Sequence, residues 1–445
     1  MKIVHVCGWY FPDSLGGTET YVASVAACLH AAGHHVAIAA PAPGAASERT
    51  YTFEGLPVYR YPIAGDATRD EAQHTVAVRG AERFHAWLQA HRPDVAHFHT
   101  FVTGVGPHEI RAARAAGARI VVTTHSGSLG FLCQRGTMLR WGRELCDGRV
   151  EVAKCAACAL QQRGMPRPAA ALLARVPVSL ASAAGRVPGK VGTTLGMPGL
   201  IARNQALQRQ MLADVDAFVV LSEWARATVV ANDGAGAPIV LNRLGVRIDR
   251  VRLAELRAAP RPPRRKHLRI AYVGRFDRIK GVHDLARAIR ALPAGAQVAC
   301  ELRGPVSNLR DLAVADELKR IVGPDAWVRF GEPIEPAGIF DYLRDIDLLC
   351  CPSRTLEGGP TVALEAMAVG TPVLGTRIGA LAEMITDGVN GRLVKPGDHR
   401  ALARAILAVA ADRAGTLDTW RRHLPPVRTM ADVTRDYLEL YTTRA

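Results

Sequence analysis

Several features are scarce or missing in this sequence of 445 residues. Aromatic residues make up only 6% of it, and no uninterrupted apolar run reaches the roughly 18 residues expected of a membrane span. The first residues favour a strand, Lys2–Val6, without the charged lead and apolar stretch of a signal peptide. No basic segment interleaved with aromatic side chains offers a platform for stacking bases. We therefore expect a cytoplasmic protein that neither spans a membrane nor binds nucleic acid.

Acidic residues are missing altogether from residues 152–213. The cations of this span are Lys154, Arg163, Arg167, Arg175, Arg186, Lys190, Arg203 and Arg209. The whole chain has a formal net charge of +15, which implies anionic partners such as phosphate-rich substrates or an anionic membrane. Two interpretations of the span remain. It is either a solvated, partly irregular insert, or it lies on an anionic membrane at the cytoplasmic face, where each basic group contributes about 1 kcal/mol.

The chain is long enough for two domains with substantial cores. Strands alternate with helices in both halves, which favours an α/β fold with parallel sheets covered by helices. A segment rich in proline and charge, residues 257–266, separates the halves. We place the N-terminal domain at residues 1–255, with an insert at about 130–210, and the C-terminal domain at residues 266–425. The expected strands are residues 2–6, 36–39, 95–98, 120–123, 218–221, 239–241, 268–273, 297–302, 328–331, 347–351, 373–374 and 391–394.

A glycine loop in the C-terminal half has the features of an anion site. Gly358, Gly359 and Pro360 follow an apolar strand, and Pro360 suits the first helical position because it lacks a backbone donor. The helix that follows, residues 361–369, ends at a glycine. Free backbone N–H groups at its start, those of Thr361 and Val362 among them, combine with the positive end of the helix dipole. This arrangement suits a phosphate or a diphosphate.

Two carboxylates flank this loop, Glu357 within it and Glu365 eight residues later. Carboxylates repel phosphates but suit neighbouring hydroxyl groups, so the implied ligand carries sugar on both sides of a diphosphate. A nucleotide sugar is such a molecule. The alternative is that Glu365 is a solvated helix residue and the glycines only form a turn, since glycine loops before helices are common.

Other candidate residues lie near the ends of expected strands, where functional loops of parallel sheets gather. Gly16 and Gly17 open a helix after the first strand, where Thr18 is a candidate cap; they either admit a phosphate or make a simple turn. His125 ends another strand, and His99 is a weaker candidate of the same kind. In the second half, Arg275 and Lys280 follow residues 268–273 and can bring two cations to a diphosphate. A solvated basic loop is the alternative interpretation.

Four of the nine cysteines fall within 26 residues: Cys133, Cys146, Cys155 and Cys158. The last two form a C-x2-C pair, and such clusters in cytosolic proteins favour a tetrahedral metal site. We expect structural zinc, because four thiolates leave no open position for a substrate. An iron–sulfur or redox site, or unligated thiols, are the alternatives.

These motifs together resemble the retaining GT-B glycosyltransferases of family 4, also described as glycosyl transferases group 1. Glu357 to Glu365, set in EGGPTVALEAMAVGTPV, is similar to the family's E-x7-E signature, and Arg275 to Gly281 resembles its G-R-x4-K-G loop. The resemblance spans most of the chain and is weakest at about residues 130–210. It implies two Rossmann-like domains whose parallel sheets face each other across a cleft. It also implies that a C-terminal helix, residues 426–445, crosses back onto the first domain.

The resemblance implies sugar transfer with retention from a nucleotide diphosphate sugar, without a catalytic metal. Glu365 would hold ribose hydroxyls and Glu357 donor-sugar hydroxyls, and His125 would lie beside the reacting sugar. Arg275, Lys280 and the backbone donors of the loop would stabilise the leaving diphosphate. The acceptor is expected to be a sugar, a lipid-linked molecule or a polysaccharide precursor. The alternatives are a nucleotide-sugar epimerase on the same scaffold and a non-catalytic nucleotide-sugar binder.

Overall fold

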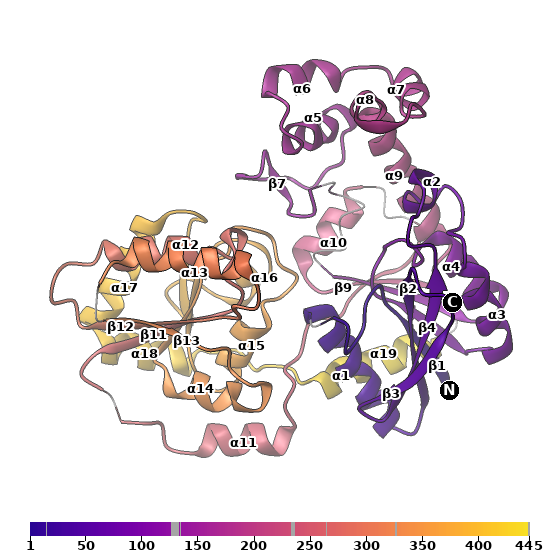
Figure 1. Ribbon diagram of the computed structural model, residues 1–445. Coiled ribbons are helices and arrows are strands. Elements are labelled where there is room, and N and C mark those ends of the chain that lie inside the picture. The colour runs from indigo at the N-terminus through magenta and orange to yellow at the C-terminus, as the bar shows by residue number, and fades with distance from the viewer. Residues whose placement is uncertain are drawn as a thin grey trace. The chain divides into compact units, whose positions relative to one another are not determined.

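A computed structural model describes residues 1–14, 16–125, 133, 135–232, 236–263, 265–324 and 327–443 (Figure 1). The chain divides into two compact units. The first unit is Met1–Arg243 together with Ala431–Ala445, and the second is Leu244–Met430. The division falls ahead of the proline-rich segment at residues 257–266, and the C-terminal helix from Ala431 onward counts with the first unit.

An eight-stranded sheet forms the centre of the first unit, in the order β10-β9-β6-β5-β1-β2-β4-β3. All neighbouring strands are parallel except β3 and β4. The central strands are almost continuously buried, as expected of strands covered on both faces. The strands are β1 (Lys2–Val6), β2 (His35–Pro43), β3 (Arg49–Phe53), β4 (Leu56–Ile63), β5 (Val95–Phe98), β6 (Arg119–Thr124), β9 (Ala217–Val220) and β10 (Ile239–Leu241).

The strands β3 and β4 are an addition to the strands expected from the sequence. They form an antiparallel hairpin at the sheet edge, joined by Glu54 and Gly55. Both residues have positive φ, 47° and 79°, which is the backbone conformation of a tight hairpin turn. The alternation in Arg49–Phe53 followed by a glycine turn was the sequence signal for this hairpin. The sheet of the first unit is therefore mixed at its edge and not parallel throughout.

Helices cover both faces of this sheet, and their apolar residues pack on it around Phe84, Phe98, Ile110 and Phe218. The N-cap of α1 is Gly16, with no side-chain cap, so the expectation that Thr18 caps this helix is wrong. The chain is already helical at Gly17, which places Thr18 inside the first turn. The helices are α1 (Gly17–Ala31), α2 (Arg69–Ala72), α3 (Ala81–His91), α4 (Pro107–Ala115), α10 (Glu223–Val230) and α19 (Met430–Thr442).

The segment between β6 and β9 forms a small hairpin and a group of helices. The helices α5 and α9 pack together around a separate apolar cluster that includes Leu160, Met197 and Ile201. The elements are β7 (Leu139–Arg140), β8 (Glu144–Leu145), α5 (Val152–Gln162), α6 (Arg167–Leu173), α7 (Val178–Ala184), α8 (Gly189–Leu195) and α9 (Met197–Ala213).

Three of these helices repeat at a spacing of eleven residues. Each of α6, α7 and α8 has seven residues, and the fourth residue of each helix is buried: Ala170, Ala181 and Gly192. The residue before each helix is a proline: Pro166, Pro177 and Pro188. A proline can start a helix but cannot continue one, so the spacing of the prolines sets the eleven-residue repeat and limits the helix lengths.

The second unit has a six-stranded parallel sheet in the order β13-β12-β11-β14-β15-β16. Its strands are β11 (Leu268–Val273), β12 (Val298–Arg303), β13 (Val328–Gly331), β14 (Leu348–Cys351), β15 (Val373–Thr376) and β16 (Gly391–Val394). Its helices are α11 (Arg250–Ala258), η2 (Arg278–Lys280), α12 (Val282–Arg290), α13 (Leu309–Val322), η3 (Pro336–Gly338), α14 (Ile339–Asp345), α15 (Thr361–Ala368), α16 (Gly379–Met384), α17 (His399–Ala411) and α18 (Arg413–Arg422).

Two apolar clusters lie in the second unit, one with α12 and α17 against β11, β12 and β14, the other around α15. Each sheet thus has its own core, as the alternating sequence pattern predicts. Within the described ranges, none of the helices combines the length and apolar character needed to cross a bilayer.

Candidate active site

An ion pair in the second unit joins two of the residues expected to act on the donor. Lys280, at the end of η2, and Glu357, in the loop between β14 and α15, have Nζ and Oε2 2.8 Å apart. Ser353 donates its hydroxyl to the other carboxylate oxygen of Glu357. The side chains of Lys280 and Glu357 are 29% and 13% exposed, so the pair is partly accessible to a ligand.

The turn that carries Lys280 is fixed by local geometry. The carboxylate of Asp277 accepts the backbone N–H of Ile279 at 3.1 Å and caps η2. Gly281 follows with φ of 74°, and any side chain there would collide with the carbonyl of Pro352. The backbone N–H of Arg354 bonds the carbonyl of Ile279 at 2.8 Å. Only glycine permits this close approach, which explains why a lysine followed by glycine reaches the loop that carries Glu357.

A second ion pair, in which only the carboxylate is buried, holds the same loop. Arg354 donates through Nε at 2.5 Å and through Nη2 to the two oxygens of Asp284, which is 2% exposed on α12. Bidentate pairs of this kind fix orientation as well as charge. Sequence reasoning did not find Ser353, Arg354 or Asp284 as site residues. Asp284 carried no sequence signal, because only the packing of α12 brings it to the loop.

Backbone donors gather at the start of α15, where the sequence predicts an anion site. Pro360 is the N-cap and the helix starts at Thr361, so proline stands one position earlier than predicted. No hydrogen-bond acceptor among the described residues serves the N–H groups of Gly358, Gly359, Thr361 or Val362. The first N–H groups of a helix have no partner within it, and the helix dipole adds positive potential there. These donors are therefore available to a phosphate.

Glu365 lies on α15 as a half-buried carboxylate. Burial raises its pKa to about 7, while the charge of Arg247 opposes the rise. Its carboxylate has no hydrogen-bond partner within the part of the chain that the structure describes. A half-buried carboxylate on α15 without such a partner is suited to accept hydrogen bonds from the hydroxyl groups of a ligand. Arg247 was not found by sequence reasoning.

Arg275 is exposed and makes no hydrogen bond or ion pair through its side chain within the described ranges. Its backbone carbonyl accepts the hydroxyl of Tyr272 at 2.6 Å. The structure therefore brings Lys280 and Glu357 into contact, whereas the action of Arg275 on the donor stays a prediction.

His125 ends a chain of histidines in the first unit. The ring nitrogens His5 Nδ1 and His99 Nε2 are 2.9 Å apart, and His99 Nδ1 and His125 Nε2 are 3.4 Å apart. His5 and His97 are register partners on the neighbouring strands β1 and β5, and His125 follows the next strand, β6. His5, His97 and His99 are fully buried, while His125 is partly exposed.

Burial keeps these imidazoles neutral. It lowers the pKa of His5 to about 3 and that of His125 to about 4, and it lowers the pKa of His97 and His99 well below the usual range. A neutral imidazole has one donor and one acceptor nitrogen, so each link in the chain constrains the tautomer of the next ring. His99, the weaker candidate of the sequence analysis, is thus the residue that orients His125.

A second set of hydrogen bonds ties the histidines to the C-terminal helix. His97 bonds the hydroxyl of Tyr441 at 2.6 Å and that of Thr123 at 2.7 Å. The hydroxyl of Tyr437 lies 2.7 Å from that of Thr123 and 2.8 Å from that of Tyr21. The ring of Tyr21 packs edge-on against His125, with centroids 5.1 Å apart. The helix α19 therefore helps to position His125 through Tyr437 and Tyr21.

The nitrogens of His5, His97 and His99 lie within 4.8 Å of one another, which is a spacing that a metal ion can use. Both nitrogens of His97 are already hydrogen-bonded to hydroxyl groups, and His5 and His99 bond each other. The histidines therefore form a hydrogen-bonded network, in which His5 Nε2 is a buried nitrogen without a partner among the described residues.

Gly16 and Gly17 lie at the start of α1, as expected. A side chain at Gly16 would collide with the carboxylate of Glu19, which also accepts the hydroxyl of Ser14 at 2.6 Å. Glu19 is 6% exposed and lies in the first turn, where an anionic ligand would otherwise bind. This carboxylate makes a phosphate site weaker here than at α15. Binding of the donor by Gly16 and Gly17 stays a prediction.

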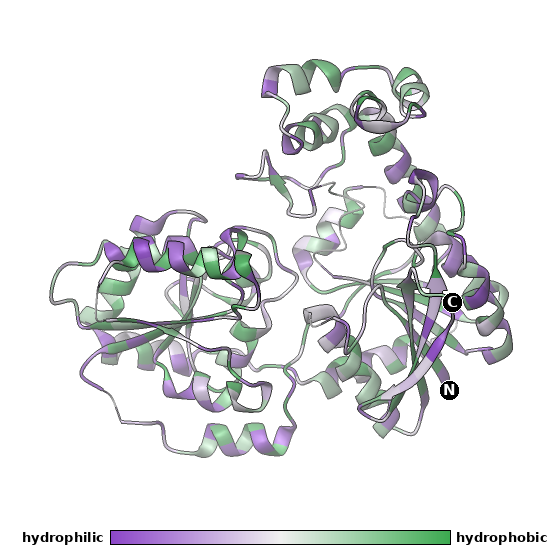
Figure 2. Ribbon diagram, in the orientation of Figure 1, coloured by the Kyte–Doolittle hydropathy of each residue, from purple (hydrophilic) through white to green (hydrophobic). Residues whose placement is uncertain are grey.

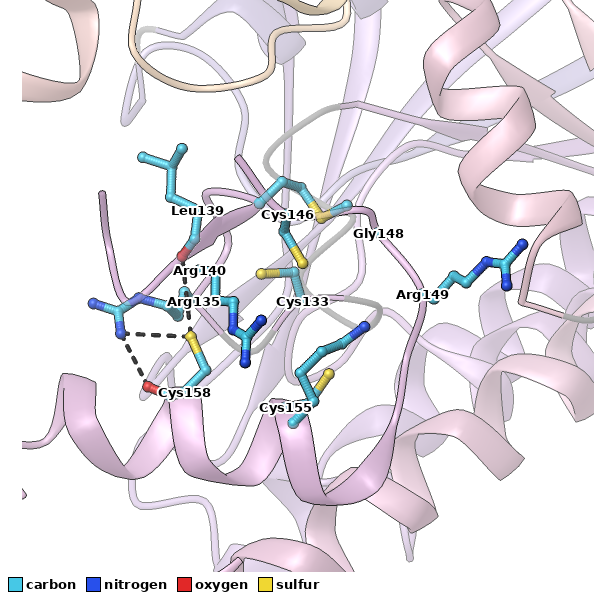
Figure 3. A pocket seen from close by; sticks show the side chains of 11 residues that line it. Cys133, Arg135, Leu139, Arg140, Cys146, Gly148, Arg149, Cys155 and Cys158 are labelled. Carbon is cyan, nitrogen blue, oxygen red and sulfur yellow. Dashed lines mark hydrogen bonds between the residues drawn. The ribbon is translucent and has the colours of Figure 1, made fainter. Parts of the chain in front are cut away.

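The four clustered cysteines surround a small cavity of about 30 Å³ (Figure 3). Cys155 and Cys158 lie on α5, while Cys133 and Cys146 come from the segment before it. The sulfur of Cys158 accepts the backbone N–H of Trp141 at 3.3 Å and a guanidinium N–H of Arg135 at 3.7 Å. A cavity of this volume holds one or two water-sized atoms but no organic substrate.

Two family descriptions match this chain. Residues 16–160 match the glycosyl transferase 4-like domain, and residues 267–412 match glycosyl transferases group 1. A D-inositol 3-phosphate glycosyltransferase of Kribbella flavida is 36% identical over 157 residues, which cover 34% of this chain and 37% of that relative. The enzyme of the same name in Streptomyces avermitilis is 27% identical over 435 residues, which cover 93% of this chain and 80% of the relative.

Solved structures share the fold of the whole chain. Sucrose-phosphate synthase from Thermosynechococcus elongatus superposes with a TM-score of 0.63 at 19% identity, covering 99% of this chain and 98% of that structure. The Anabaena protein HepE in complex with UDP and glucose has a TM-score of 0.61 at 14% identity, covering all of both chains. Two α/β units with these neighbours have the GT-B fold. The chain belongs to the glycosyl transferases group 1 family, as the two signatures predicted.

Proposed function

We propose that this protein transfers a sugar from a nucleotide diphosphate sugar to an acceptor with retention at the anomeric carbon. The observation that carries the proposal is the ion pair between Lys280 of η2 and Glu357, because Glu357 lies in the loop that leads to the free N–H groups of α15. A cation and unpaired backbone donors beside one another suit a diphosphate whose charge grows as the sugar leaves. This donor set can supply the electrostatic stabilisation that a catalytic metal supplies in other transferases.

Each remaining site residue has a role in this proposal. Glu357 accepts hydroxyls of the donor sugar and Glu365 accepts those of the ribose. Ser353 and the Arg354–Asp284 pair hold the loop that carries Glu357. His125, oriented by His99, lies beside the reacting sugar as a neutral imidazole. Such a ring donates or accepts a hydrogen bond without adding charge.

The acceptor is proposed to be a lipid-linked molecule or a polysaccharide precursor, reached at an anionic membrane surface. The relatives are named D-inositol 3-phosphate glycosyltransferases, after a small phosphorylated molecule. Residues 161–266, which include most of the basic helices, lie outside both family matches. The acceptor preference is therefore expected to differ from that of those relatives.

A donor screen tests the proposal. Purified protein is mixed with a panel of nucleotide sugars, and both the thermal midpoint and the release of free sugar are measured. We expect one donor to raise the midpoint and to be hydrolysed slowly without an acceptor. Release of an epimerised sugar would favour an epimerase, and stabilisation without turnover on any acceptor would favour a binder. No stabilisation by any nucleotide sugar would overturn the donor site itself.

We also propose that Cys133, Cys146, Cys155 and Cys158 hold one structural zinc ion. All four line the same cavity, and two N–H groups donate to the sulfur of Cys158, as second-shell donors do at thiolate ligands. Burial raises the pKa of Cys155 to about 11, so a bound cation is needed to keep this sulfur as a thiolate. When bound, zinc would tie α5 to the segment before it and would take no part in catalysis.

Metal analysis of the purified protein tests this assignment. We expect one zinc per chain, which is lost in Cys155→Ser together with Cys158→Ser. Cys28→Ser, a substitution on α1 far along the chain, serves as the control and keeps the metal. Iron with sulfide in place of zinc, or a metal-free wild-type protein with an unchanged thermal midpoint after chelation, would contradict it.

A further inference from the structure

The helices α6, α7 and α8 expose an unusual number of large apolar side chains. Six of the sixteen exposed large apolar residues of the described chain lie between residues 172 and 195: Leu172, Val178, Leu180, Val187, Val191 and Leu195. In Figure 2 these helices are mostly green and pale, with little purple. The third helical residue is exposed and apolar in both α7 and α8, at 63% for Leu180 and 64% for Val191. The repeat therefore places such residues at equivalent positions.

The charge on the same helices has one sign. No acidic residue occurs anywhere in residues 152–213. The exposed cations of the repeat are Arg167, Arg175, Arg186 and Lys190. Two of them, Arg175 and Arg186, stand eleven residues apart at the same position of the repeat. Each is followed by valine and proline.

The repeat is anchored to the rest of the first unit. Arg69, which begins α2, donates to the carbonyls of Val187 and Gly189 at 3.2 Å and to the hydroxyl of Thr193 at 2.9 Å. Arg203 on α9 donates to Gln73 at 2.5 Å. The helices are thus held in place, and their apolar side chains are exposed because nothing in the described chain covers them.

We propose that α6, α7 and α8 form a docking surface for an anionic lipid bilayer. A helix that binds at a membrane interface has apolar side chains flanked by arginine and lysine. The apolar side chains insert at the boundary of the acyl chains, and the basic side chains bind lipid phosphates. Charge complementarity selects a lipid surface over a second copy of this chain, because two copies of this acid-free surface would repel each other. The surface deepens the proposed function, because it would hold the protein beside a lipid-linked acceptor.

Vesicle sedimentation with the full chain tests the surface. We expect the wild-type protein to bind vesicles that contain phosphatidylglycerol and not vesicles of phosphatidylcholine alone, with binding that weakens as salt rises. The triple variant Leu172→Ser, Leu180→Ser and Val191→Ser should reduce the partition coefficient by about tenfold or more. The variant Arg175→Gln, Arg186→Gln and Lys190→Gln should reduce it by a similar factor and flatten the salt dependence.

Two control variants change exposed apolar or basic side chains outside α6, α7 and α8. Leu309→Ser, Val251→Ser and Val230→Ser change residues that are 85%, 70% and 59% exposed, against 74%, 63% and 64% for the test residues. Lys266→Gln, Arg400→Gln and Arg404→Gln remove three exposed cations outside the repeat. We expect both control variants to bind vesicles as the wild type does.

Three outcomes would overturn the docking surface. They are no binding of the wild type to anionic vesicles, unchanged binding by the apolar triple variant, and a changed oligomeric state of that variant without a loss of vesicle binding. The last would assign the surface to contact between copies. The lipid-free donor measurement is separate, so intact donor binding with failed vesicle binding would reject the surface and leave the proposed function standing.

Discussion

The candidate site residues of the two units differ in charge and in burial. In the second unit, Lys280 pairs with Glu357 in a partly exposed loop. In the first unit, three histidines are completely buried and the fourth, His125, is partly exposed at the end of their network. Burial holds their pKa values far enough down that the rings stay neutral at physiological pH.

The difference follows from what each region is proposed to face. A leaving diphosphate gains negative charge, which is best met by a fixed cation and aligned backbone donors. A sugar is neutral, and a neutral ring of fixed tautomer orients it without adding attraction to phosphate. The charged Lys280 in the second unit and the neutral histidines in the first unit are therefore two forms of preorganisation. Each can be tested by a substitution that changes one and leaves the other.

The largest expected effect comes from Lys280→Ala. It removes the cation and leaves the carboxylate of Glu357 without its partner at 2.8 Å, so turnover should fall by about 100-fold or more. Transfer or donor hydrolysis at saturating nucleotide sugar measures the effect. The control is Lys319→Ala, which removes a lysine that pairs with Asp316 on the exposed side of α13. A loss of turnover no larger than that of the control would reject the charge-stabilising role.

His125→Ala should lower turnover by about 100-fold, within the range of positioned histidines. His99→Ala should have a smaller effect, about tenfold, because His99 acts through the orientation of His125. His99→Gln keeps a donor and an acceptor, so it should recover part of the activity. Because the pKa of His125 is about 4, its ring should cause no inflection of the pH–rate profile between pH 5.5 and 8. An inflection that disappears in His125→Ala would contradict the neutral ring.

Glu365 and Glu109 offer a comparison between the units, because burial raises the pKa of both to about 7. Between pH 4.5 and 7 the folded protein binds more protons than the unfolded chain at these groups, so stability falls as pH rises through that window. Each shift corresponds to roughly 3 kcal/mol of unfolding free energy at most. Glu365→Gln and Glu109→Gln should each flatten the decline in unfolding free energy between pH 5 and 8.

Donor binding should differ between the Glu365→Gln and Glu109→Gln variants. Only Glu365→Gln should weaken the stabilisation by the donor, because Glu109 is 1% exposed on α4 in the other unit. Denaturant unfolding at the two pH values gives the first quantity, and thermal shift with the nucleotide sugar gives the second. Equal loss of donor binding in both variants would show that the effect is general destabilisation.

The smallest expected effect concerns the link between the C-terminal helix and the histidine network. Tyr437→Phe removes a hydroxyl that lies 2.8 Å from Tyr21 and 2.7 Å from Thr123, and should cost about 1 kcal/mol of unfolding free energy. A double-mutant cycle with Tyr21→Phe measures the coupling by denaturant unfolding. Additive losses would mean that the two hydroxyls act independently.

Features that depend on neighbouring residues along the chain could be predicted from the sequence. Buried strands appear as short apolar runs, and the glycine loop with its helix start appears as residues 358–361. The turn after Lys280 requires a glycine at position 281, so this signature is visible as neighbouring residues in the sequence. The cysteine cluster and the acid-free segment, residues 152–213, can likewise be recognised from residues that are close in the sequence.

Contacts between residues far apart in the sequence could be seen only in the folded chain. His5, His97 and His99 come together because β1 and β5 are neighbours in the sheet, and strand order leaves no mark on local pattern. Asp284 reaches Arg354 through the packing of α12. The hairpin β3–β4 was missed because its edge strand is half exposed and lacks a clear apolar run. Local conformational preferences determine where helices and strands form. The burial of their apolar faces determines which of these elements pack against each other.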